Sequence, residues 1–235
     1  GGTAVVEAES FEAGKAVTIK DMLDFTPGVF AQSRVNEEAR LSIRGSGLSR
    51  TFHMRGIRLL QDGIPINLAD GGSDFQDIDP LALQHVEVYK GANALQYGAA
   101  NLGGAINFVT PTGYTTPNSV LRLDAGSHEF ARAQFKTGDV LGNWDYFASL
   151  SQLRSDGFRQ FSGQKNTRLN ANAGLKISPQ LETRFYIIHG DLNQELPGNL
   201  TKAQLQSNPT QANAASAAAN SQRDFLITRL ANKTT

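Results

Sequence analysis

The sequence predicts a mixed α/β domain over residues 1–112, followed by a series of antiparallel strands over residues 113–235. Three observations support this fold class. Helix caps and short strand-like runs alternate up to Pro111, segments with strictly alternating polarity follow it, and short and long connections alternate between those segments.

The first part carries clear local signals for short helices and turns. Thr18 with Asp21 predicts a capping box, and Pro27-Gly28 ends the helix that follows. Asp79-Pro80 offers an N-cap and a first-turn proline for a second helix. Asp62-Gly63 lies between two apolar runs and predicts a hairpin turn. These signals favour a small sheet with short helices packed on it.

The second part is built from segments in which apolar and polar residues alternate. The clearest covers residues 168–177, where the odd positions from Leu169 to Ile177 are mainly apolar and the even positions from Arg168 to Lys176 are mainly polar. A period of two is typical of strands with two different faces. Similar segments cover residues 121–125, 131–136, 143–154, 181–191 and 225–233.

The connections between these segments favour a transmembrane β-barrel. Those at 138–142 and 178–180 are short, whereas those at 155–164 and 192–221 are longer. Outer-membrane barrels have short periplasmic turns and long outer loops. Charged faces are expected to line the lumen, since Arg or Lys on the lipid face costs roughly 2–4 kcal/mol at the midplane. Closed barrels need about eight strands, and this chain has six candidates. The chain is therefore expected to be truncated, as the N-terminal portion of a longer protein.

A soluble β-rich binding or adhesion module remains the alternative, because sandwich strands alternate as well. That fold would require the apolar face around Leu169 to be buried by another sheet. Composition narrows the function classes further. Lys+Arg and Asp+Glu both number 22, which argues against a nucleic-acid partner, and the absence of cysteine excludes disulfides and thiolate chemistry.

Enzyme motifs are incomplete in this sequence. His128-Glu129 begins a zinc-protease pattern, but Arg132 stands where the second histidine would ligate. The glycines from Gly98 to Gly104 lack the lysine and serine or threonine of a phosphate loop. We therefore predict no enzymatic activity, no catalytic residues, no protein-held metal and no cofactor.

Three segments in register carry a family resemblance. They are LSIRG at 41–45, LQDGIPIN at 60–67 and VEVYKGANALQYGAANLGGAINFVT at 86–110. In this order and spacing they resemble the plug domain of TonB-dependent outer-membrane receptors. The resemblance implies a plug followed by the first strands of a barrel of about 22 strands. It also implies location in the bacterial outer membrane, among its lipids.

The resemblance further implies active transport of a metal chelate, a ferric siderophore or ferric citrate. The implied protein partner is TonB with its inner-membrane energising complex. Residues 56–65, 71–76 and 189–201 look like the ferric dicitrate receptor branch. A receptor used mainly for signalling is a second alternative. Residues 3–6 superficially resemble a TonB box, but they occupy the position of the plug's first strand, so the box is expected upstream.

Two groups of site residues follow from the resemblance. Arg44 of the Ile-Arg-Gly motif is implied to face the barrel wall, together with Lys90, where the family more often has arginine, and Glu87. An ordinary surface arginine is the alternative for Arg44. Loops at the plug apex are implied to contact the ligand, since arginine and amide groups suit an anionic chelate. The alternative for each of these residues is an ordinary polar loop. The apex candidates are Gln32, Arg34, Arg50, Phe52, Ser73, Phe75 and Gln76.

Overall fold

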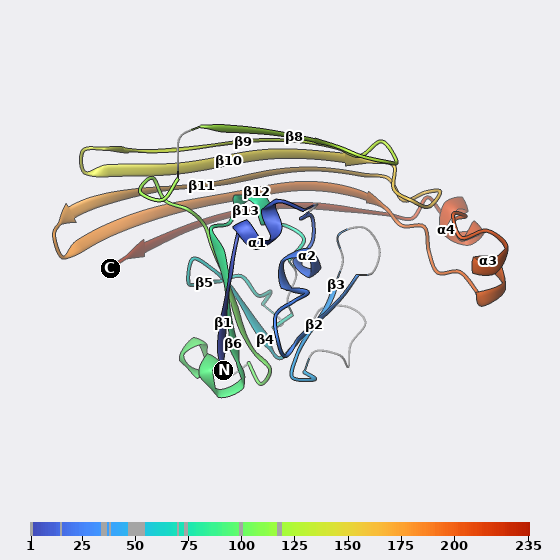
Figure 1. Ribbon diagram of the computed structural model, residues 1–235, viewed down its shortest axis with the longest axis horizontal. Coiled ribbons are helices and arrows are strands. Elements are labelled where there is room, and N and C mark those ends of the chain that lie inside the picture. The colour runs from blue at the N-terminus through green and yellow to red at the C-terminus, as the bar shows by residue number, and fades with distance from the viewer. Residues whose placement is uncertain are drawn as a thin grey trace. The chain divides into compact units, whose positions relative to one another are not determined.

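The computed structural model describes residues 2–14, 16–33, 37, 39–46, 55–69, 71–72, 75–98, 101–116 and 119–235. The chain divides into two compact units, Gly1–Pro111 and Thr112–Thr235. The elements of both are labelled in Figure 1. Within the described ranges, no helix has the length and apolar character needed to cross a membrane.

The first unit is organised around a five-stranded sheet with the order β1-β6-β7-β4-β5. All neighbouring strands are antiparallel except β4 and β7, which are parallel. A separate two-stranded sheet pairs β2 with β3. The strands are β1 Thr3–Glu7, β2 Val29–Ser33, β3 Ala39–Ile43, β4 Ile57–Gln61, β5 Ile64–Pro65, β6 His85–Lys90 and β7 Gly104–Val109.

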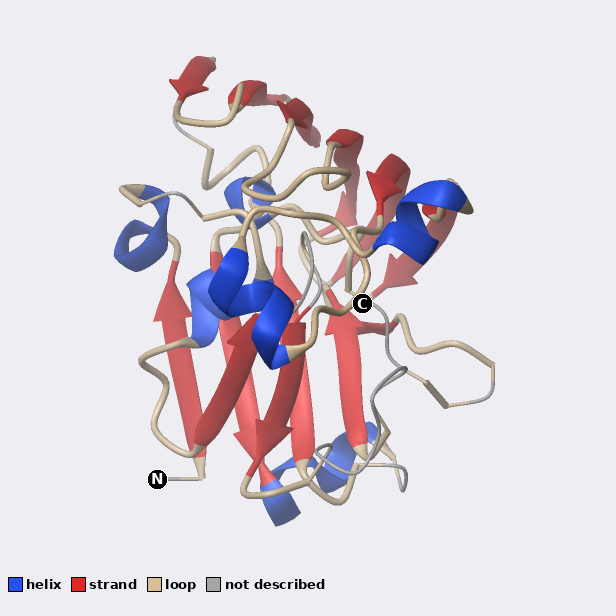
Figure 2. Ribbon diagram, turned by 90° about the vertical axis from the view of Figure 1, so that its right-hand side faces the viewer, coloured by secondary structure: helices blue, strands red, loops and turns tan. Residues whose placement is uncertain are grey.

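The helices of the first unit are short pieces between strands, as Figure 2 shows. Thr18 and Asp21 form the predicted capping box at the start of α2, and Asp79 caps η1 as predicted. The predicted hairpin turn is also confirmed. Asp62 and Gly63 have φ values of 54° and 82° between β4 and β5, as a type I′ turn requires. The helices are α1 Glu9–Glu12, α2 Ile19–Leu23, η1 Pro80–Ala82 and η2 Gly91–Tyr97.

The core of the first unit lies on one face of its five-stranded sheet. Alternate residues of the central strands point into it, and the helices contribute Phe11, Met22 and Leu23. The opposite face of the sheet carries a smaller cluster in which Leu60, Ala94 and Ala105 are buried. The strand residues in the main core are Ile57, Leu59, Val86, Val88, Ile106 and Phe108.

The second unit is a six-stranded antiparallel meander in which each strand pairs with its neighbours in sequence. All six predicted strands are present. The strands are β8 Val120–Ala125, β9 Ala131–Leu141, β10 Trp144–Ser155, β11 Gln164–Ser178, β12 Leu181–Glu195 and β13 Gln222–Thr234.

Several of these strands are longer than the polarity pattern predicted. The connection expected at 138–142 is wrong, because β9 continues to Leu141 and only residues 142–143 form the turn. Residues 137–141 remain paired with β10, and backbone ladder bonds do not depend on side-chain polarity. The long connection predicted at 192–221 covers only 196–221, because β12 continues to Glu195. It contains α3 Lys202–Ser207 and α4 Ala214–Ala218.

Candidate functional site

The six-stranded sheet of the second unit exposes its apolar face and buries its polar face, which is the reverse of a sheet in a soluble protein. We call the face that carries Leu123, Leu150 and Leu230 the apolar face, and these side chains are 71%, 52% and 76% exposed. The opposite, polar face carries Ser149 and Arg168, which are 0% and 4% exposed. A soluble sandwich buries its apolar faces. An exposed apolar face opposite a buried polar face instead suits strands surrounded by lipid.

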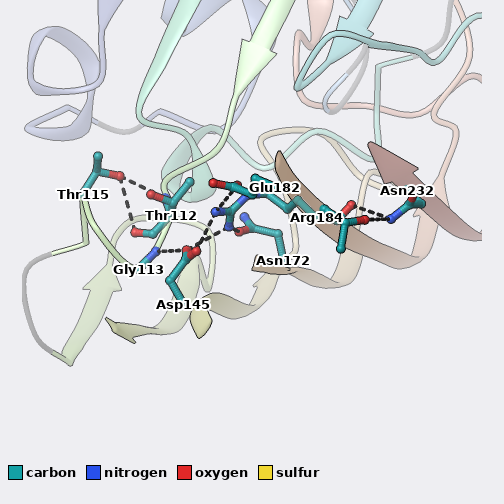
Figure 3. A network of polar contacts seen from close by, with 9 residues as sticks. Thr112, Gly113, Thr115, Asp145, Asn172, Glu182, Arg184 and Asn232 are labelled. Carbon is teal, nitrogen blue, oxygen red and sulfur yellow. Dashed lines mark hydrogen bonds and ion pairs between the residues drawn. The ribbon is translucent and has the colours of Figure 1, made fainter. Parts of the chain in front are cut away.

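A buried ion pair lies on the polar face near the short turns (Figure 3). The Arg184 guanidinium donates to both carboxylate oxygens of Asp145, at 2.8 and 2.6 Å. It also donates to the side-chain oxygen of Asn172 at 2.7 Å and to Glu182 at 2.9 Å. Asp145 is 1% exposed, so this two-pronged contact neutralises a carboxylate that has lost its water.

The same carboxylate fixes the segment that enters the second unit. The backbone N–H of Gly113 donates to Asp145 at 3.0 Å. A Cβ at Gly113 would lie 2.2 Å from the carbonyl oxygen of Asp139, so only glycine fits without a shift of the backbone. The Lys176 ammonium lies 4.1 Å from the ring centroid of Tyr114. Residues 112–116 are therefore anchored to the sheet by several independent contacts.

A second charged cluster lies on the polar face at the opposite end of the sheet. Asp124 accepts from Arg122 at 3.0 Å and from Arg132 at 2.8 Å. Arg132 is 6% exposed. Both clusters lie on the polar face of the sheet. That this face lines a lumen stays a prediction.

Arg159 joins two of the connections beyond this end of the sheet. Its guanidinium donates to the backbone carbonyls of Gln211, Gly198 and Pro197 at 3.1, 2.7 and 3.2 Å. Burial lowers the pKa of Arg159 from its ordinary value. One side chain in the connection 156–163 thus holds three carbonyls of the connection 196–221.

In the first unit, Glu87 is the centre of a polar cluster. It accepts from the Tyr89 hydroxyl at 3.0 Å and from the Asn107 amide at 2.8 Å. His85 lies 3.6 Å from its other oxygen. Burial, together with hydrogen bonds to Tyr97 and Glu87, raises the pKa of Tyr89 well above its ordinary value.

The predicted wall-facing residues occupy two places in the first unit. Arg44, at φ 52°, directly follows β3, and a Cβ on Gly91 would lie 3.2 Å from its guanidinium. Lys90 is 6% exposed, and its Cδ would lie 3.8 Å from a Cβ on Gly28, whose carbonyl accepts from Arg44 N–H. Glu87 lies on the opposite face of β6 from Lys90, since side chains alternate along a strand. Their contact with a barrel wall stays a prediction.

The predicted ligand residues are only partly placed. Gln32 is exposed on β2, opposite Arg40. Phe75 and Gln76 differ from the expected surface positions: they are 8% and 4% exposed, and Phe75 belongs to the apolar core. Burial of an aromatic ring stabilises that core, so Phe75 is a packing residue. The remaining candidates lie outside the described residues: Arg34, Arg50, Phe52 and Ser73.

Two groups were not predicted as site residues, namely the Asp145–Arg184 pair and Arg159. Alternation places Asp145 on the polar face, but nothing in the sequence pairs it with a residue 39 positions away. Arg159 lies in a connection without periodicity, so its three carbonyl partners follow only from the folded loops.

Comparison with known proteins identifies relatives of both parts. Residues 1–105 match the family described as TonB-dependent Receptor Plug Domain. The chain is 30% identical over 141 residues to the vitamin B12 transporter BtuB of Vibrio vulnificus, covering 60% of this chain and 23% of that protein. It is 25% identical over 206 residues to the ferrioxamine receptor of Yersinia enterocolitica, covering 85% and 28%. The hemin receptor of Yersinia enterocolitica is 34% identical over 169 residues, covering 66% and 24%.

Solved structures share the fold. The ferric citrate transporter FecA in its unliganded form superposes with a TM-score of 0.72 at 21% identity, over 90% of this chain and 34% of that one. The siderophore receptor PirA of Acinetobacter baumannii gives a TM-score of 0.67 at 19% identity, over 92% and 34%. The chain spans 23% to 28% of the length of the curated relatives named above. Plug match and fold agree with the resemblance in the sequence: residues 1–105 belong to the plug domain family of TonB-dependent receptors, and they are followed by antiparallel strands that share the fold of solved receptors.

Proposed function

We propose that this chain supplies the plug and the first wall strands of a transporter that imports a metal chelate across the bacterial outer membrane. One observation carries the proposal: a plug-type domain is followed by a sheet whose apolar face is exposed and whose polar face is buried. Lipid would contact the apolar face, and the polar face would line the lumen.

The named relatives support a ferric chelate as the ligand class. Ferrioxamine and hemin are the ligands in the names of two of them, and ferrichrome and aerobactin occur in the names of further relatives, although vitamin B12 occurs as well. Ferric citrate is the narrower candidate. The proposed contacts are the exposed Gln32 with Arg34 and Arg50, because guanidinium groups bind oxygen-rich anions through paired hydrogen bonds.

Transport would need no covalent chemistry from this chain. The chelate would bind at the plug apex, and TonB with its inner-membrane complex would pull on the periplasmic side to rearrange the plug. Thr3–Glu7 pairs along its length with β6, so it serves as a sheet strand. The anchored residues 112–116 would keep the end of the plug attached while the plug rearranges.

The test is uptake of radioactive iron by cells whose only candidate receptor is the complete gene. Ferric citrate, other ferric siderophores, hemin and a cobalt chelate are compared with TonB present and absent. We expect TonB-dependent uptake of one ferric chelate, and a loss of at least tenfold in the R34A/R50A variant. The matched control is K20A, which removes a half-buried cation of α2 that is paired with Asp24 of the same segment.

Each outcome has a defined reading. Uptake of a chelate other than ferric citrate supports the transport function and rejects ferric citrate as the ligand. Unchanged uptake in the R34A/R50A variant rejects the proposed contacts. If no chelate is taken up in a TonB-dependent manner, the proposed transport function is wrong.

A further inference from the structure

Charge is unevenly divided between the two faces of strands β11, β12 and β13. All residues of these strands are described, and alternation along each strand assigns every side chain to one face. The apolar face carries one cation, Lys165, and three acids, Asp191, Glu195 and Asp224. The polar face carries one acid, Glu182, and six cations, namely Arg168, Lys176, Arg184, Arg223, Arg229 and Lys233.

The excess of positive charge is specific to the polar face. Lys+Arg and Asp+Glu are equal in number in the whole chain, so a basic composition does not explain it. Glu182 is bound to Arg184, which also pairs with Asp145 of β10. Lys176 lies over the ring of Tyr114. The other four cations therefore give this face of β11 and β13 a net positive charge.

These four cations are spread along the length of the strands. Arg223 and Lys233 are ten residues apart on β13, which is about 34 Å and comparable with the hydrocarbon core of a bilayer, about 30 Å. Arg229 lies between them. Arg168 lies two strands away in the row of Ile227, with Gly190 between them. Successive cations are thus about 12–17 Å apart at their Cα atoms, a distance that long arginine and lysine side chains shorten.

An incompletely bonded amide pair lies beside the first of these cations, at the end near the long connections. Gln164 and Gln194 are directly paired, and Arg223 is the neighbour of Gln194 on β13. Gln194 is 3% exposed. Among the described residues, neither its Nε2 nor its Oε1 has a hydrogen-bond partner, and the same is true of Oε1 of Gln164. Buried amides are normally hydrogen-bonded, so this end suits a ligand that supplies both donors and acceptors.

The chemistry of this end selects an oxygen-rich anion. A guanidinium binds carboxylate oxygens, and the amide groups of glutamine can donate to carboxylates and accept from hydroxyls. A surface lined by charges of one sign also raises the local concentration of the opposite sign. A cation or a neutral ligand would gain nothing from the excess charge.

We propose that the polar face of β11–β13 is the path along which an anionic, oxygen-rich chelate crosses the outer membrane. The chelate enters beside Gln194 and Arg223 and passes Arg168 and Arg229 to Lys233. Several spaced cations attract an anion without one tight site that would retain it. The inference rests on the proposed function, and it adds a path along the wall to the contacts proposed at the plug apex.

The test separates binding from transport in cells that carry the complete receptor. Radioactive iron is supplied as ferric citrate, which is anionic, or as a neutral ferric trihydroxamate. Cells without TonB give the Kd, and cells with TonB give the initial uptake rate. We expect R168Q/R229Q to lower the uptake rate of ferric citrate about tenfold and to change its Kd less than twofold. R168K/R229K keeps both charges and should recover most of the rate. The matched control is K165Q, which removes a cation from the opposite face of β11.

A second variant leaves all cations in place. Asn170 follows Arg168 by two residues on β11 and lies in the row of Arg229. N170D keeps the volume of the side chain and adds a carboxylate, which repels an anion. It should slow uptake of ferric citrate and leave uptake of the neutral chelate unchanged. Rates are normalised to the amount of each variant in the outer-membrane fraction.

The outcomes distinguish the path from the proposed function. If the wild type takes up no chelate in a TonB-dependent manner, the proposed function fails. If it does take one up, unchanged ferric citrate uptake in R168Q/R229Q and N170D overturns the path. A parallel loss of binding and uptake also overturns it, because the face would then belong to the binding site. Uptake of the neutral chelate alone, or an equal loss for both chelates, overturns the role of the charge.

Discussion

At the scale of single residues, the Arg184–Asp145 contact is a buried ion pair on which stability should depend strongly. Asp145 is 1% exposed. Without Arg184 its carboxylate would keep the Gly113 N–H as a donor but lose its opposite charge. Breaking a buried pair from one side costs about 3–5 kcal/mol. We therefore expect R184M to lower the free energy of unfolding of the complete receptor by that amount in urea titrations in detergent.

The control for this pair is K202M, which changes an exposed side chain and should shift the free energy of unfolding by less than about 0.5 kcal/mol. The double variant D145N/R184M should recover part of the loss, because no charge is then left unpaired. Equal stabilities of R184M and K202M would contradict the role of the pair.

Tyr89 makes the stability of the first unit depend on pH in the alkaline range. Its pKa is raised because burial and the nearby Glu87 and Tyr97 disfavour the phenolate. The folded pKa therefore lies above the unfolded value of 10.0, so the stability that Tyr89 contributes is fully present below pH 10 and is lost as the pH rises further. Ultraviolet difference spectra should show a late-ionising phenol that is missing in Y89F. A spectrum unchanged by Y89F would refute this assignment.

At the scale of elements, Arg159 holds the connection 196–221 in place. Three carbonyls of that connection would lose their donor in R159A. Stability is local in such loops, and opening depends on few contacts. Hydrogen–deuterium exchange should become at least tenfold faster for amides of residues 197–213, whereas β11 should be unchanged. K202A, in the same connection, serves as the control, and equal exchange in both variants would reject the claim.

Elements with local signals were predictable from the sequence. The capping box at Thr18, the cap at Asp79 and the turn at Asp62-Gly63 each depend on residues within four positions of one another. The end of β9 was not predictable, because residues 137–141 are held by ladder bonds to β10 and not by their own polarity. The buried position of Phe75 also escaped prediction, since packing against distant strands decides it.

At the scale of the whole molecule, the apolar face predicts how substitutions depend on depth. Ala173 lies at the middle of the apolar positions 169–177 of β11, and Thr167 lies beyond their end. An arginine should cost about 2–4 kcal/mol at the midplane and about 0–1 kcal/mol near the interface. We expect A173R to reduce assembly in the outer membrane far more than T167R, measured by fractionation. Equal assembly of both variants would argue against a lipid-facing sheet.

The sequence by itself determined the order of the two parts, the strands of the second part and the family resemblance. Period-two alternation and short motifs are local, and local patterns survive in a linear chain. Only the tertiary structure decided which groups meet: Asp145 with Arg184, and Arg159 with three distant carbonyls. Such contacts depend on strand register and loop closure, and a polarity pattern specifies which face a side chain occupies but not the partner opposite it.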